Sequence, residues 1–143
     1  MNWSPLTASR PYNWPLDGDW SAGDTALIVI DMQNDFLNPN GYFGQMGYSL
    51  EHTRAAIKPT QSLLSAARQQ GLPIIYTLES HRPDLADLNP TKRARAEAIG
   101  TPIGQSGPMG RFLVQGEPGS QVVPELAPAS SDIILLKPGN GAY

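Results

Sequence analysis

The chain has 143 residues, a formal net charge of −3 and no cysteine. Its length suits one ordinary domain, and its charge argues against an unspecific nucleic-acid binder or a polybasic membrane-surface protein. Without cysteine, this sequence holds no disulfide scaffold, zinc finger or iron–sulfur site. No apolar run approaches the roughly 20 residues that cross a bilayer. The N-terminus lacks the pattern of a secretory leader, so the expected location is the cytoplasm.

The first 24 residues form a segment of their own. Residues 1–24 are rich in tryptophan and proline and show no helical or strand periodicity. Trp3, Trp14 and Trp20 are too apolar to leave in water, so we expect an ordered arm that packs on the domain or on a neighbouring subunit. The remaining residues, 25–143, are expected to belong to one domain.

Three apolar runs predict the strands of a parallel sheet. Residues 25–30 and 73–78 are continuous and β-branched, which is typical of strands buried on both faces. Residues 57–70 lie between these two runs and have apolar positions at helical spacing. The order strand, helix, strand predicts a βαβ unit with a right-handed crossover. Pro59 suits the first turn of this helix, and Gly71 suits the position after its end. A third buried strand is expected over residues 133–136, ending at Lys137.

Residues 82–121 are polar and irregular, and a segment of this length between buried strands usually has a functional reason. A short helix is expected over residues 91–99. The charged side chains of this region are expected on a solvated face and in subunit contacts: Asp84, Asp87, Lys92, Arg93 and Arg95. Three strands are few for an open α/β sheet, so we expect an α/β domain that is incomplete in this chain.

Charged residues follow two of the predicted strands directly. Asp31 ends the first strand and Lys137 ends the third, which places both at the carboxyl edge of the sheet. Ligands bind at this edge in α/β proteins, and an acid–amine pair there could transfer protons. The alternative is a structural ion pair, or two charges that mark where each strand reaches water.

Two motifs carry a resemblance to a known family. The segment Asp31-Met32-Gln33-Asn34-Asp35-Phe36 and the segment Lys137-Pro138-Gly139-Asn140-Gly141-Ala142-Tyr143 resemble the isochorismatase-like cysteine hydrolases. The resemblance implies a Rossmann-like three-layer α/β/α fold with a parallel sheet. It also implies that Asp31 and Lys137 are the first two members of a catalytic Asp-Lys-Cys triad. We therefore expect the fold and the cysteine to be completed by a C-terminal part or a second chain, within a homo- or hetero-oligomer.

Other segments are most similar to biuret hydrolases, with ureidoacrylate amidohydrolases next. They are Pro11–Pro15, Gly41–Tyr48, Glu79–Leu88 and Gly107–Arg111. The resemblance implies a small ureido-type amide as substrate and the release of ammonia.

Four polar or aromatic residues follow the first two strands and are candidates for substrate binding: Gln33, Phe36, Glu79 and His81. Three of them have a structural alternative. Phe36 could pack under its loop, and Glu79 and His81 could stabilise a loop together with Arg82.

We expect no cofactor and no metal, because His52 and His81 are far apart in sequence and no closely spaced Asp and His cluster is present. His52 is expected on a helix surface. Nucleic acid and membrane are not expected partners. The competing hypothesis is an inactive α/β fragment or pseudoenzyme that acts as a binding or assembly module through its open sheet.

Overall fold

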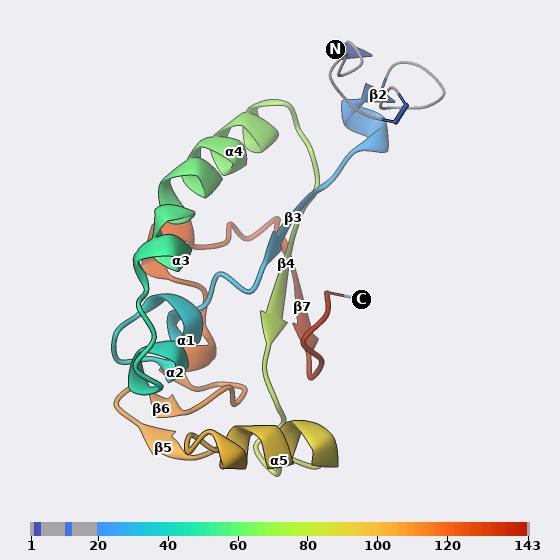
Figure 1. Cartoon of the computed structure of the whole chain (residues 1–143). Helices are drawn as coiled ribbons and strands as arrows, with labels where there is room; N and C mark the ends of the chain where they lie inside the picture. The colour runs from blue at the N-terminus through green and yellow to red at the C-terminus, as the bar shows by residue number, and fades with distance from the viewer. Residues whose placement is uncertain (1, 4–10, 13–19, 143) are drawn as a thin grey trace.

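The computed structural model describes residues 2–3, 11–12 and 20–142. Its centre is a parallel three-stranded sheet in the order β3-β4-β7, as Figure 1 shows. The strands are β3 (Leu27–Ile30), β4 (Ile74–Glu79) and β7 (Ile133–Lys137). All three predicted strands are therefore present, and the α/β class with a parallel sheet is confirmed.

Helix α4 (Ile57–Gln69) makes the crossover between β3 and β4, and the short helix α3 (Glu51–Ala55) precedes it. Pro59 lies in the first turn of α4, where a missing N–H costs no hydrogen bond. Gly71 follows the helix with φ of 69°, a left-handed conformation that glycine adopts without strain. The predicted helix and its end signals are thus confirmed.

The main hydrophobic core lies between α4 and one face of the sheet. Leu64 of α4 packs in one buried cluster with Val29 of β3 and Tyr76 of β4. The hydroxyl of Tyr76 donates to the backbone oxygen of Leu126 at 2.9 Å, so this buried polar group is satisfied. Leu126 belongs to the short helix η3 (Pro124–Leu126) and packs in the same buried cluster.

The opposite face of the sheet is bare among the described residues. In the register of the sheet, Ile28 of β3 and Ile133 of β7 flank the same residue of β4. Ile30 of β3 and Leu135 of β7 flank another. Each of these four side chains is close to half exposed. The expectation that the first strand is buried on both faces is therefore wrong for this chain, because α4 covers only one side of it. The expectation of a buried third strand is also wrong, because the residues of β7 from Ile133 to Leu136 are each about half exposed on both faces.

A second cluster lies below the sheet and is built from short elements. Tyr42 of α2, Phe112 and Leu113 pack there with Leu88 and Ala96. Figure 1 shows α5 beneath the ends of β4 and β7, in the position where the arrowheads of these strands point. The remaining elements of this region are α1 (Asn34–Leu37), α2 (Tyr42–Gln45), α5 (Pro90–Ala98), β5 (Ser106–Gly107), β6 (Gly110–Arg111) and η2 (Pro118–Ser120).

Only part of the predicted arm is described. β1 (Asn2–Trp3) pairs with β2 (Trp20–Ser21) in antiparallel fashion, and η1 (Ala22–Asp24) leads into the sheet. The predicted packing of the tryptophan side chains lies outside the described residues. Within the described part of the chain, no helix is both long and apolar enough to cross a membrane.

Candidate functional site

Asp31 and Lys137 meet at the carboxyl edge of the sheet. They follow β3 and end β7, on either side of β4. The Nζ of Lys137 donates to the Oδ2 of Asp31 at 2.7 Å, and the two side chains are 12% and 19% exposed. Thr77 of β4 donates its hydroxyl to the other carboxylate oxygen at 3.3 Å. A partly buried carboxylate with a cationic neighbour can exchange a proton, and the ammonium can stabilise a developing negative charge.

The backbone of Asp31 is unusual. Its φ is 54°, in the left-handed region that few residues other than glycine, asparagine and aspartate adopt. Its N–H still donates to the carbonyl of Thr77 at 2.9 Å, as in the sheet. The chain therefore turns away directly after the last sheet bond, and the carboxylate reaches across β4 toward Lys137.

Lys137 is held by the turn that follows it. Its Nζ donates to the backbone oxygens of Gly139 at 3.1 Å and Asn140 at 3.4 Å, besides Asp31. Three oxygens thus share the ammonium, which has three N–H donors.

Gln33 is fully buried and its amide binds backbone groups. The Nε2 donates to the carbonyls of Glu79 and Ser120, both at 2.9 Å, and the Oε1 accepts from the N–H of Glu79 at 2.8 Å. The side chain of Gln33 therefore links the loop after β3 to the end of β4 through hydrogen bonds. Neither of its N–H donors remains for a ligand.

Phe36 borders the cavity next to the site, which measures about 410 Å³. Its ring packs edge-on against Phe43, with the ring centres 4.8 Å apart. The cavity wall contains aromatic and apolar side chains together with the polar or charged residues Glu79, Lys92, Arg95 and Asn140. A volume of this size lies in the range of pockets that hold small organic ligands, and a planar ligand could stack on such a wall.

Glu79 is 8% exposed and pairs with a lysine that comes from α5. The Nζ of Lys92 lies 2.6 Å from the Oε1 of Glu79. Both residues line the cavity. The expectation of a solvated Lys92 is wrong, because its side chain is only 16% exposed and is paired.

His81 lies away from the cavity wall and is completely buried. Its Nδ1 is 3.3 Å from the Oδ1 of Asp87, which also accepts from the N–H of Arg82. Burial, and then the charge of Lys92, lower the pKa of His81 below its usual value. These contacts match the alternative of a loop-stabilising network. The Nε2 of His81 and the Oγ of Ser80 are buried without a hydrogen-bond partner among the described residues.

Sequence reasoning gave Asp35 no role, yet it holds the loops of the site together. It is 1% exposed; its Oδ1 accepts from the N–H of Tyr42 at 3.2 Å and its Oδ2 from that of Leu113 at 2.9 Å. Burial raises the pKa of Asp35 above its ordinary value, although the two backbone donors oppose the shift. Its position four residues after Asp31 was the only signal, and it does not reveal contacts with residues so distant in sequence.

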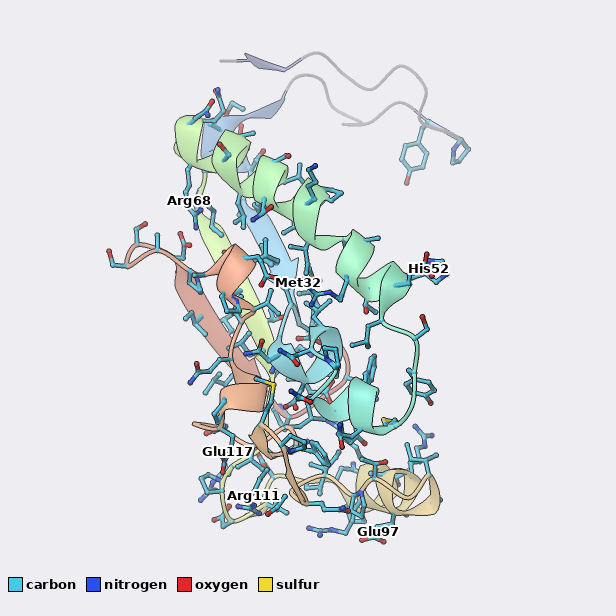
Figure 2. The ribbon with its side chains drawn as sticks, turned by 90° about the vertical axis from the view of Figure 1, so that its left-hand side faces the viewer. Met32, His52, Arg68, Glu97, Arg111 and Glu117 are labelled. Atoms are coloured by element: carbon cyan, nitrogen blue, oxygen red, sulfur yellow. The ribbon has the colours of Figure 1, made fainter. Side chains whose placement is uncertain are left out.

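No group of three or more histidine, cysteine, aspartate or glutamate side chains gathers as a metal site within the described part of the chain. His52 is exposed on α3, as expected. Figure 2 shows it far from Glu97 of α5 and pointing away from the ribbon.

Residues 25–143 match the isochorismatase domain. The chain belongs to the isochorismatase family. A solved isochorismatase family protein from Desulfovibrio vulgaris subsp. vulgaris str. Hildenborough is 30% identical, with a TM-score of 0.59 over 79% of this chain and 52% of that one.

Two further solved structures are similar. A cysteine hydrolase from Pseudomonas syringae pv. phaseolicola 1448A is 28% identical, with a TM-score of 0.63 over 82% of this chain and 48% of that one. The N-carbamoylsarcosine amidase from Thermoplasma acidophilum is 27% identical, with a TM-score of 0.50 over 78% of this chain and 50% of that one. This chain therefore spans about half the length of these similar solved structures.

Proposed function

We propose that this chain is part of an amidohydrolase that cleaves a C–N bond of a small ureido-type amide and releases ammonia. The observation that carries the proposal is the 2.7 Å pair of Asp31 and Lys137 at the carboxyl edge of an isochorismatase-family sheet. In this proposal both residues are catalytic. The nucleophile is a cysteine from outside this sequence, which contains none.

The proposed reaction proceeds in two stages. Asp31 accepts the proton of the thiol, whose ordinary pKa near 8.5 leaves little thiolate at neutral pH. The thiolate attacks the amide carbonyl carbon, and Lys137 stabilises the oxyanion. When the C–N bond breaks, Asp31 returns the proton to the leaving nitrogen and ammonia departs. Water, deprotonated by Asp31, then hydrolyses the thioester and regenerates the thiol.

The binding part of the proposal rests on the cavity. Phe36 supplies a ring against which a planar ureido group can stack, and Glu79 supplies a carboxylate that can accept from its N–H groups. In this proposal Gln33 and His81 do not contact the substrate, because both are completely buried, and they support the loops around the cavity. Similarity to an amidase of a carbamoyl compound supports a ureido substrate, and the sequence resemblance favours biuret as the first compound to test.

The test uses the completed enzyme, by which we mean this chain together with the C-terminal part or second chain that carries the cysteine. Ammonia release is measured with biuret, ureidoacrylate, a carbamoyl amino acid and nicotinamide. We expect steady release from a ureido compound that iodoacetamide and the Asp31→Asn substitution both stop. Release from nicotinamide alone would overturn the substrate class, and no release from a completed enzyme with a reactive thiol would overturn the activity.

The bare sheet face favours one alternative, a binding module without catalysis. Ile28, Ile30, Ile133 and Leu135 form an apolar surface that a second polypeptide could cover. This function predicts a complex that forms equally well with Asp31→Asn and that never releases ammonia. Size-exclusion chromatography with the assay above separates the two functions, and also measures the expected oligomer.

A further inference from the structure

Lys92 connects α5 to two parts of the site at once. Its Nζ lies 2.6 Å from the Oε1 of Glu79 and donates to the backbone oxygen of Pro138 at 2.7 Å. Glu79 is the last residue of β4, and Pro138 directly follows Lys137. One ammonium group therefore joins the end of the central strand to the turn after the edge strand.

The turn that Lys92 holds is the same turn that surrounds the ammonium of Lys137. The carbonyls of Gly139 and Asn140, one and two residues after Pro138, accept from the Nζ of Lys137. A shift of the turn would thus move two of the three oxygens around this ammonium. The third is the carboxylate of Asp31.

Lys92 also pairs with the carboxylate of Glu79, which would otherwise compete with Asp31 for the ammonium of Lys137. Glu79 and Lys137 are partners in the register of β4 and β7, so their Cα atoms lie on adjacent strands, about 4.8 Å apart. Glu79 is 8% exposed, and a buried carboxylate without a cation is unfavourable. If Lys92 were neutral, the cation opposite Glu79 in the sheet register would be Lys137, which now pairs with Asp31.

We propose that Lys92 is a positioning residue. It neutralises Glu79 and fixes the turn 138–140, and so keeps the ammonium of Lys137 directed at Asp31. The positional part stands on this chain alone. The consequence for turnover rests on the proposed function.

The first experiment measures the position directly, by NMR of the 143-residue chain with the side-chain signals of Asp31 and Lys137 assigned. We expect Lys92→Met to shift both signals, and Lys92→Arg, which keeps the charge, to restore them in large part. The matched control is Arg93→Met, an exposed neighbour on α5. Unchanged Asp31 and Lys137 signals in folded Lys92→Met would overturn the proposal.

A double variant separates competition from general damage. Glu79→Gln with Lys92→Met leaves no unpaired buried charge, so it is expected to fold even if Lys92→Met alone does not. We expect this variant to return the Asp31 and Lys137 signals toward their native positions. Signals that move further away would overturn the competition mechanism.

The second experiment measures turnover in the completed enzyme. We expect Lys92→Met to lower kcat on the order of 10²-fold, the effect of a small misplacement of a catalytic group, with a much smaller change in KM. Arg93→Met is expected to leave both unchanged. Native kcat in Lys92→Met would overturn the positioning role. An inactive native enzyme would instead contradict the proposed function and leave the NMR result as it stands.

Discussion

Glu79 and Lys137 lie opposite each other in the register of β4 and β7, yet each forms its ion pair with a different partner. Glu79 pairs with Lys92 of α5, and Lys137 pairs with Asp31 after β3. Along the carboxyl edge the order is therefore Asp31, Glu79 and Lys137, and Lys92 reaches Glu79 from α5. Each acid at this edge therefore has a cation of its own, and both ion pairs are largely buried.

The Asp31→Asn substitution should remove turnover in the completed enzyme and leave the fold intact. Asparagine tolerates the left-handed backbone of this position, whose φ is 54°, but it cannot accept the thiol proton. We expect kcat to fall by at least about 10²-fold, with the free energy of unfolding lowered by about 0.5–3 kcal/mol, because Lys137 loses its counter-charge but keeps its backbone acceptors. A near-native kcat would falsify the assignment of Asp31 as the general base.

The Asp35→Ala substitution should destabilise the chain. It leaves the buried N–H groups of Tyr42 and Leu113 without acceptors, at about 1–3 kcal/mol each. Asp35→Asn should cost less, because its amide oxygen still accepts one bond and burial already disfavours the charged carboxylate. Urea unfolding measures both, with the exposed Asp84→Ala as the control. Equal stability of the alanine variants at 35 and 84 would contradict the role of Asp35.

Acid should destabilise the chain through His81. Burial lowers the pKa of His81 in the folded state, so the unfolded chain takes up the proton first as the pH falls below about 6.5. Stability from the neutral imidazole is therefore present at higher pH and is lost as the pH decreases through that window. Urea unfolding at pH 7.5 and 5.5 should show a smaller loss for His81→Gln than for the native chain. His52→Gln, at an exposed position, should behave like the native chain, and the same pH dependence in all three would refute this explanation.

The two faces of the sheet should respond oppositely to substitution. Leu64→Ala, in the core between α4 and the sheet, should lower the free energy of unfolding by about 2–5 kcal/mol. Leu135→Thr, on the bare face, should cost little in the 143-residue chain and should reduce binding of the dye ANS and self-association. In the completed enzyme Leu135→Thr should become costly, if the added part covers this face. A small cost there as well would show that the face stays in contact with water.

The elements whose signals are local could be predicted from the sequence. The apolar runs gave the three strands, and Pro59 and Gly71 marked the limits of α4. The position of two charges at strand ends was enough to predict that Asp31 and Lys137 approach each other, because parallel strands end at a common edge.

The rest depends on contacts between distant segments, which spacing does not reveal. Lys92 lies in a basic helix that is typical of a solvated surface, and only its contact with Glu79 and Pro138 gives it another role. Gln33 lies within the motif, directly after the first strand, which is typical of a ligand-binding residue, but its amide binds backbone groups at positions 79 and 120. Burial on both faces of β3 was predicted from composition, which does not tell what covers each face.

The left-handed backbone at Asp31 limits which side chains can replace it. Glutamate would carry the same charge but would strain the main chain and lengthen the reach to Lys137, so an acid-for-acid exchange should be damaging at this position. Asparagine fits with almost no strain. The amide variant is therefore a suitable protein for soaking experiments, since it should retain the shape of the native pocket and hold an uncleaved substrate long enough for diffraction.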